Sequence, residues 1–219
     1  ILYEKNHKVA EIWRYLITTK KKDILGLPLL DRGQSLDDFK QLSDVEKWFI
    51  GFSVNNGVAS PCKRLSVWQK SASKNAKFWG EKRRQVIADQ IHKIKHWRIF
   101  EGDYTSCPDV SATWFIDPPY QLSGVHYPEH DLDYPSLATW CQSREGQIIV
   151  CENKGADWLP FRTFIKIQAA TRKHKKTAFS YEVIWTKDPL AMKKEELQKT
   201  HEDLAPDVAA LILMPLDSD

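Results

Sequence analysis

The sequence lacks paired cysteines, a long apolar run and a secretory leader, and each absence excludes a class of protein. The chain has four cysteines and seven histidines. No two cysteines form a CxxC pair, which argues against a zinc site and a secreted disulfide framework, and we interpret the histidines as structural. No apolar stretch approaches the roughly 20 residues of a membrane span, and no signal-peptide pattern opens the chain. We therefore expect a cytoplasmic protein that binds no membrane and no metal.

Aromatic and basic residues are abundant, and the basic ones are unevenly spread. The 219 residues include nine tryptophans and have a net charge of +3. Residues 63–98 contain eleven Lys or Arg but only two acidic residues, so this stretch alone has a charge of +9. Trp68, Phe78, Trp79 and Trp97 lie among these charges. A basic run interleaved with aromatics favours a nucleic-acid partner, although a solvated helical surface is the simpler alternative.

The first 96 residues read as mainly helical. Residues 1–4 resemble the end of a short strand. Asn6 is a typical N-cap, and it precedes apolar residues at helical spacing, namely Val9, Ile12, Trp13, Leu16 and Ile17. Residues 20–32 contain glycine and proline breakers and read as a loop. Ser43 and Glu46 form a capping box before a second helix, and a third helix is expected over about 76–95. No strand is expected between 20 and 96.

After residue 96 the pattern changes to short apolar strands that end in polar residues. Strands are expected at 98–100, 114–116 and 147–151, with a helix at 133–144, and an antiparallel pair at 164–169 and 178–186. Alternating strands and helices predict an α/β fold with a mostly parallel sheet. Ligands bind beyond the carboxyl ends of such strands, so Glu4, Asp103, Asp117 and Asn153 are expected on one rim. The tail, 188–219, includes a charged helix at 193–203 but has no assigned role.

The stretch TWFIDPPY, residues 113–120, ends an apolar strand with a carboxylate, two prolines and an aromatic ring. Pro118 and Pro119 fix the backbone and remove two N–H donors, so the chain leaves the strand in a rigid, non-helical turn. Asp117 and the Pro118 carbonyl are hydrogen-bond acceptors, and Tyr120 offers a flat face for stacking. These features fit a planar base that has an amino group. The bland alternative is an ordinary Pro-Pro turn with a packing tyrosine.

The chemistry of such a site is amine methylation. The amino nitrogen of adenine is a poor nucleophile because its lone pair is delocalised into the ring. Hydrogen bonds from this nitrogen to Asp117 and the Pro118 carbonyl would free the lone pair for attack on a sulfonium methyl. Alignment and electrostatics then supply most of the rate. A base in duplex DNA has to flip out to reach the site, and stacking on Tyr120 would offset part of that cost.

From Tyr3 to Thr186 the chain resembles the Dam-like N6-adenine DNA methyltransferases of the alpha group, in particular those of phages and prophages. The resemblance rests on FIDPPY together with YEKNHKVAEIWRYLI, FEGDYTSC, QIIVCENKGADWLPF and FIGFSVNNGVASP. It implies a class I, Rossmann-like methyltransferase sheet from 1–19 and 97–187, with a helical target-recognition insert at 20–96. The implied reaction transfers a methyl group from S-adenosylmethionine to N6 of a flipped adenine, with Asp117, Pro118, Pro119 and Tyr120 as catalytic residues.

The resemblance also implies binding roles. For the cofactor these are Glu4 at the ribose hydroxyls, Asp103 and Tyr104 beside the adenine, and Asp117 at the reacting end. For double-stranded DNA we expect basic contacts to phosphates, which position a duplex without reading its sequence: Lys63, Arg64, Lys82, Arg83, Arg84, Arg172, Lys173, Lys175 and Lys176.

The family's first strand and glycine-rich loop, which hold the methionine part of the cofactor, should precede Glu4 and are missing from this sequence. Either a segment before Ile1 supplies them, or the domain no longer binds cofactor and is a non-catalytic DNA-binding subunit. An RNA adenine-N6 or DNA cytosine-N4 methyltransferase would suit the same acceptors. The sequence does not give the recognition site, the oligomeric state (a homodimer or a partner subunit included) or the existence of a cognate restriction nuclease.

Overall fold

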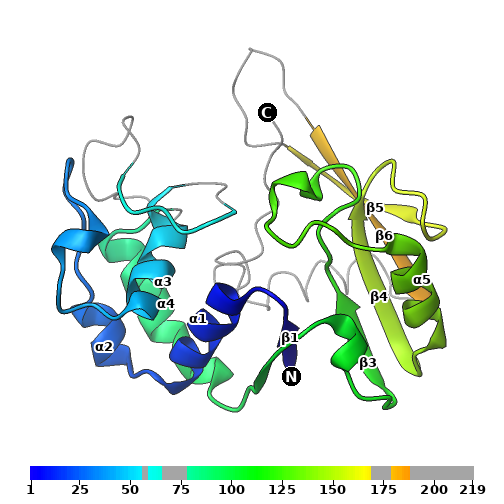
Figure 1. The fold of residues 1–219 in the computed structure, drawn as a ribbon, viewed down its shortest axis with the longest axis horizontal. Coiled ribbons are helices and arrows are strands. Elements are labelled where there is room, and N and C mark those ends of the chain that lie inside the picture. The colour runs from blue at the N-terminus through cyan, green and yellow to red at the C-terminus, as the bar shows by residue number, and fades with distance from the viewer. Residues whose placement is uncertain (56–58, 66–77, 169–178, 188–219) are drawn as a thin grey trace. The chain divides into compact units, whose positions relative to one another are not determined.

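The computed structural model describes residues 1–55, 59–65, 78–168 and 179–187, and the chain divides into two compact units (Figure 1). The first unit comprises Ile1–Ser106 and the second begins at Cys107. Among the described residues, no helix has both the length and the apolarity to cross a membrane.

The first unit is mainly helical and includes one pair of short parallel strands. Its helices and strands are β1 (Leu2–Glu4), α1 (His7–Thr18), α2 (Lys21–Gly26), α3 (Asp44–Val54), α4 (Glu81–Gln90) and β2 (Ile99–Glu101). Short 3-10 helices lie at Leu36–Asp38, Ile91–Ile94 and Tyr104–Ser106. β1 pairs with β2 in parallel, with Glu4 opposite Glu101. The carboxyl ends of both strands therefore lie at the same edge.

Apolar faces of all four helices meet in one core. Ile12 and Leu16 of α1, Phe49 of α3 and Ile87 of α4 are at most 1% exposed. Trp79 completes this core: its ring packs edge-on against Phe49 at 5.5 Å, and its Nε1 donates to the Pro28 carbonyl at 2.7 Å. Because helices before and after residue 20 share the core, α1 belongs to the same compact unit as the helices of the expected insert.

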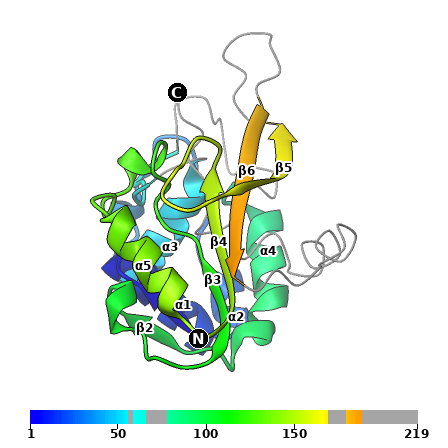
Figure 2. The same cartoon turned by 90° about the vertical axis from the view of Figure 1, so that its right-hand side faces the viewer.

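The second unit is built on a four-stranded mixed sheet. Its strands are β3 (Ala112–Ile116), β4 (Gly146–Asn153), β5 (Arg162–Gln168) and β6 (Phe179–Lys187). The order across the sheet is β3-β4-β6-β5 (Figure 2), with β3 parallel to β4 and the other two pairings antiparallel.

One helix, α5 (Tyr134–Ser143), connects β3 to β4 and covers one face of the sheet (Figures 1 and 2). Trp140 of α5 packs edge-on against Trp114 of β3, with ring centroids 5.5 Å apart. β4 starts at Gly146, where φ is +92° and an added Cβ would lie 2.2 Å from the Ala112 carbonyl oxygen. Only glycine allows this approach of β4 to β3.

Most predicted elements are confirmed. Asn6 accepts hydrogen bonds from the Lys8 and Val9 amides at the start of α1, and the Ser43–Glu46 capping box begins α3. All six predicted strand regions contain strands, and β5 and β6 form the expected antiparallel pair. The expected helix at 193–203 lies outside the described residues.

Three predictions are wrong in detail. Residues 21–26 form α2 rather than a loop, because Ile24 is fully buried and the Asp23 carboxylate accepts the Lys20 amide at 3.1 Å. The third helix begins at Glu81, after an extended Gly80, and changes to a 3-10 helix at Ile91. The described strands also form a mixed sheet and a separate parallel pair rather than one mostly parallel sheet.

Candidate functional site

The DPPY segment follows the carboxyl end of β3. β3 ends at Ile116, so Asp117 is the first residue beyond the strand, next to the end of the parallel strand β4. Asp117, both prolines and Tyr120 are all half-buried. Asp117 is thus partly exposed as a residue, but its carboxyl group is largely buried.

Two contacts hold the turn itself. The Tyr134 hydroxyl, on the first residue of α5, donates to the Pro119 carbonyl at 2.7 Å. The Gly124 amide donates to the Tyr120 carbonyl at 2.6 Å. Gly124 packs so closely that an added Cβ would lie 2.7 Å from the Pro119 carbonyl carbon. The proline turn is thus fixed from both sides, and its second carbonyl is already used by Tyr134.

A second carboxylate, Glu182 of β6, holds the Tyr120 side chain. The Tyr120 hydroxyl donates to Glu182 Oε2 at 3.2 Å. Glu182 reaches this position because β6 pairs with β4, where it lies opposite Asn153. Asn153 in turn donates from Nδ2 to Ser123 Oγ at 2.8 Å. The end of β4 and an inner position of β6 are therefore joined to the DPPY segment and to the loop that follows it.

A third carboxylate, Glu152 of β4, is completely buried. Its Oε1 accepts the Gln121 amide at 2.7 Å and Trp158 Nε1 at 3.0 Å, and its Oε2 accepts the Asn153 amide at 2.8 Å. Three N–H donors compensate for the lost hydration, as a buried charge requires. Because Gln121 follows Tyr120 directly, Glu152 ties the exit of the DPPY segment to the end of β4.

Burial and like charges govern the protonation of this site. Burial raises the pKa of Asp117 to about 6, a hydrogen bond with Tyr120 opposes the rise, and the negative charges of Glu182 and Glu152 add to it. Burial also raises the pKa of Glu152 and that of the Cys151 thiol. Cys151 therefore stays protonated and is a poor nucleophile.

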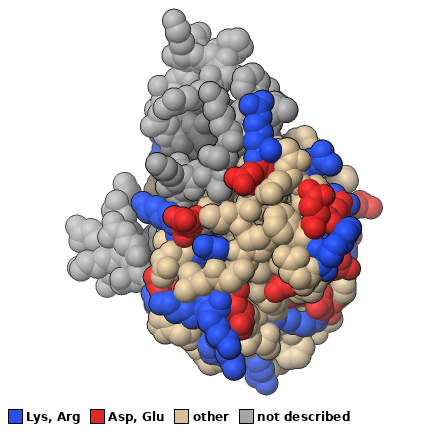
Figure 3. All heavy atoms as spheres, turned by 90° about the vertical axis from the view of Figure 1, so that its left-hand side faces the viewer, with Lys and Arg blue, Asp and Glu red and all other residues tan. Residues whose placement is uncertain are grey.

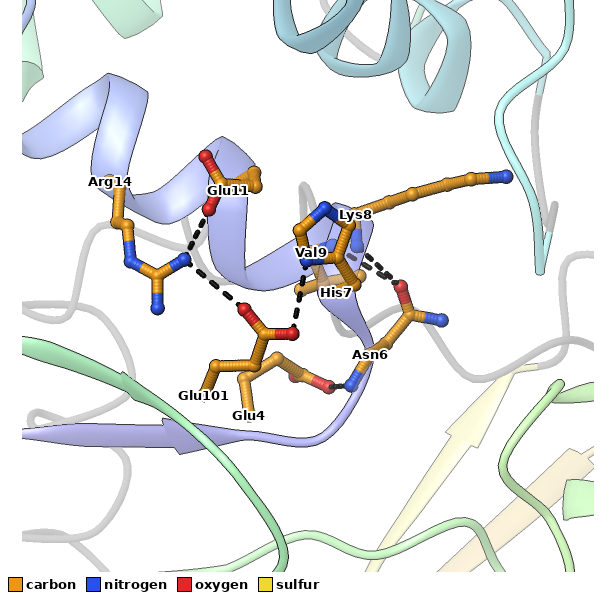
Figure 4. A network of polar contacts seen from close by, with 8 residues as sticks. All are labelled: Glu4, Asn6, His7, Lys8, Val9, Glu11, Arg14 and Glu101. Carbon is orange, nitrogen blue, oxygen red and sulfur yellow. Dashed lines mark hydrogen bonds and ion pairs between the residues drawn. The ribbon is translucent and has the colours of Figure 1, made fainter.

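The residues expected at the cofactor lie in the first unit, at the carboxyl edge of the β1–β2 pair. Glu4 ends β1, and its Oε1 accepts the Asn6 amide at 2.7 Å (Figure 4). Asp103 follows β2, accepts the Thr105 amide at 3.1 Å and forms a 3.4 Å ion pair with Lys5. Tyr104 begins the adjoining 3-10 helix. The structure thus brings Glu4, Asp103 and Tyr104 to one edge, and Asp117 belongs to the other unit.

A polar network beside this edge contains three groups of the kind that bind metal ions. His7, Glu11 and Glu101 have potential ligand atoms within 4.8 Å of one another. Arg14, however, forms ion pairs with both carboxylates, and His7 Nδ1 lies 3.0 Å from Glu101 Oε1 (Figure 4). A guanidinium shared by the two carboxylates compensates their charge, so the network is a structural ion-pair cluster that joins α1 to β2.

The basic residues expected at DNA phosphates have unequal surroundings. Lys82 and Arg64 are exposed, and Lys63 is exposed but forms a 2.8 Å ion pair with Asp37. Arg83 is only 6% exposed, and Arg84 Nη1 donates to the Leu27 carbonyl at 2.5 Å. Burial of Arg83 and the internal hydrogen bond of Arg84 make a phosphate contact less favourable for these two, and the contact stays a prediction. The expected contacts at Arg172, Lys173, Lys175 and Lys176 lie outside the described residues.

Two aromatic residues of the basic run pack inside the protein rather than lying exposed among the charges. Trp79 is buried in the core, and Trp97 packs against Trp13 with ring centroids 5.6 Å apart. On the face drawn in Figure 3, Lys and Arg side chains alternate with Asp and Glu rather than forming one basic patch. Trp79 and Trp97 therefore lend less support to nucleic-acid binding than their place in the sequence suggests, and Trp68 lies outside the described residues.

Sequence patterns alone do not assign Glu152 or Glu182 to the site, although Glu152 has a signal. Ile148, Val150 and Glu152 are in phase along β4, and all three are fully buried. A carboxylate on the apolar face of a strand is rare without a function or a set of donors. Glu182 had no such signal, because its role depends on the pairing of β6 with β4.

Compared with known protein families and with curated proteins, the chain matches none.

Proposed function

We propose that the chain is a DNA adenine N6-methyltransferase that uses S-adenosylmethionine, with the DPPY segment as its base-binding site. The observation that supports this most is the excess of acceptors around Asp117. The groups that shift its pKa are one tyrosine and two carboxylates, and the Pro118 carbonyl is adjacent in the chain. A site with many acceptors and few donors favours a ligand that supplies N–H groups, such as the amino group of adenine.

Each residue then has a defined task. Asp117 and the Pro118 carbonyl accept the two hydrogens of the amino group, which localises the lone pair on nitrogen. Tyr120 stacks on the base; such stacking is worth about 1 to 3 kcal/mol per base. The Pro119 carbonyl bonds to Tyr134, so we assign the second acceptor to Pro118. The bound cofactor supplies a methyl group on a positively charged sulfur, and Asp117 can take up the proton that the amine loses.

The chemistry of the residues at the β1–β2 edge fits the nucleoside part of this cofactor. Carboxylates at the ends of parallel strands are suitable acceptors for ribose hydroxyls, and Glu4 and Asp103 occupy such positions. Tyr104 provides an aromatic face for the adenine. We assign no described residue to the methionine part of the cofactor. A Rossmann-like strand order belongs to the same proposal.

The test is methyl transfer from tritiated S-adenosylmethionine to separate DNA and RNA pools, followed by chromatography of the nucleosides. The protein should include any residues encoded before Ile1. The proposal predicts labelled N6-methyladenine from DNA. Labelled N4-methylcytosine would identify cytosine as the target base instead, and label in RNA alone would identify RNA as the substrate. Binding of DNA without any transfer would instead support a non-catalytic DNA-binding subunit.

A further inference from the structure

The Tyr120 hydroxyl lies between two carboxyl groups but has a single hydrogen. It donates to Glu182 Oε2 at 3.2 Å, and it lies close enough to Asp117 to influence the pKa of that carboxyl group. One hydrogen cannot serve two carboxyl groups fully. Because the hydrogen is directed to Glu182, Asp117 keeps acceptor capacity for a proton or a ligand.

The positions of the two carboxyl groups indicate which of them accepts the hydrogen bond from Tyr120. Glu182 is on β6 inside the sheet, with Asn153 on one side and Ile165 of β5 on the other. Asp117 is on the turn beyond β3. We propose that Glu182 is a positioning residue for the base-binding site: it holds the Tyr120 hydroxyl, fixes the plane of the ring, and leaves Asp117 to accept from the amino group. The inference rests on the proposed function and names a residue that the family motif does not include.

The groups that face Asp117 come from several elements. They are Tyr120 on its own turn, Glu182 of β6, Cys151 and Glu152 of β4, and Tyr127 of the following loop. Removal of the charge at 182 should make Asp117 easier to ionise, whereas removal of the Tyr120 hydroxyl should make it harder. Two neighbouring substitutions should therefore move the pH dependence of the reaction in opposite directions. These shifts report that both groups act on Asp117, whereas the KM of the Glu182 variants reports whether Glu182 positions Tyr120.

Four variants test the proposal: Glu182→Ala, Glu182→Gln, Tyr120→Phe and the double variant Tyr120→Phe/Glu182→Ala. Glu145→Gln is the matched control, because it removes an exposed carboxylate at the opposite end of β4. Methyl transfer to unmethylated plasmid DNA is measured from pH 5 to 9, with circular dichroism to check folding.

We expect Glu182→Ala to raise the KM for DNA roughly tenfold, the size expected when a hydrogen bond to a charged group is lost. The KM of the double variant should be no higher than that of the more impaired single variant, because both substitutions remove the same hydrogen bond. Glu182→Gln keeps an acceptor, so its KM should stay near that of the wild type while the acidic limb of its pH profile moves to lower pH. Tyr120→Phe should move this limb to higher pH, and Glu145→Gln should move nothing.

A readout that needs no catalysis separates this inference from the proposed function. The carboxyl carbon of Asp117 can be titrated by NMR in the wild type, Glu182→Gln and Glu145→Gln. A lower midpoint in Glu182→Gln alone supports the coupling even if no methyl transfer is found. If the wild type is active but Glu182→Ala keeps its KM, or if the midpoint does not move in Glu182→Gln, the inference is overturned and the proposed function is unaffected.

Discussion

The first unit and the candidate site of the second unit use charged side chains in opposite ways. In the first unit, cations meet anions or carbonyls: Lys63 pairs with Asp37, and Lys95 Nζ donates to the Leu16 and Ile17 carbonyls at the end of α1. In the second unit, carboxyl groups gather around Tyr120, and the pKa values of Asp117 and Glu152 are raised by burial. The first pattern stabilises a fold, whereas the second lowers stability and is typical of functional sites.

Of the substitutions considered, one beside the proline turn of the second unit should have the largest effect on stability and activity. Gly124→Ala would place a Cβ 2.7 Å from the Pro119 carbonyl carbon and 3.0 Å from Pro119 Cβ. We expect a loss of about 1 to 3 kcal/mol in the free energy of unfolding, with loss of methyl transfer. Urea denaturation and the transfer assay measure both. Gly26→Ala in the first unit is the control, because no atom lies within 4 Å of its added Cβ; equal losses in both variants would contradict the account.

Asp117→Asn should stabilise the protein at neutral pH. The folded pKa of about 6 exceeds the unfolded value of about 3.9, so folding favours the protonated carboxyl group. The stability that this provides is fully present below about pH 4 and is lost as the pH rises through about 6. We expect Asp117→Asn to be more stable than the wild type by about 1 to 2 kcal/mol at pH 7.5, with a smaller gain at pH 4.5. Equal gains at both pH values would show that burial of a charge is not the cause.

Removal of a charge from the first unit should lower stability, whereas Asp117→Asn should raise it, and the change should be smaller. Lys95→Met removes hydrogen bonds to the last carbonyls of α1, and we expect a loss of about 0.5 to 1 kcal/mol. Lys63→Ala breaks an exposed ion pair and should change stability by less than about 0.5 kcal/mol. Thermal unfolding at low and high salt measures both. A gain in stability for either variant would remove the contrast between the units.

The sequence predicted local structure better than it predicted the use of side chains. Strands and capped helices follow from short patterns, such as Asn6 before α1, and were found where expected. The start of α2 was missed because Gly26 and Pro28 mark where a helix ends but give no sign of where it begins. The strand order was not predictable, since it depends on pairings between residues far apart in the chain.

The basic run shows why charge alone is a weak guide. Arg83 was expected at the surface, yet it lies four residues before the buried Ile87 and thus on the same face of α4. Helical spacing could have revealed this. The candidate site was only partly predictable: Asp117 and Tyr120 stand out in the sequence, but Glu182 meets Tyr120 only through the pairing of β4 with β6.

The central claim is that Asp117 acts on the amino group of a bound base rather than in DNA binding or folding. The most direct measurement compares the wild type with Asp117→Ala in methyl transfer from labelled cofactor and, in parallel, in DNA affinity by fluorescence anisotropy. The account predicts that transfer falls by about a hundredfold to a thousandfold, as for loss of a key electrostatic group, while the Kd for DNA changes only a few-fold. Retained transfer, or a loss of affinity as large as the loss of transfer, would contradict it.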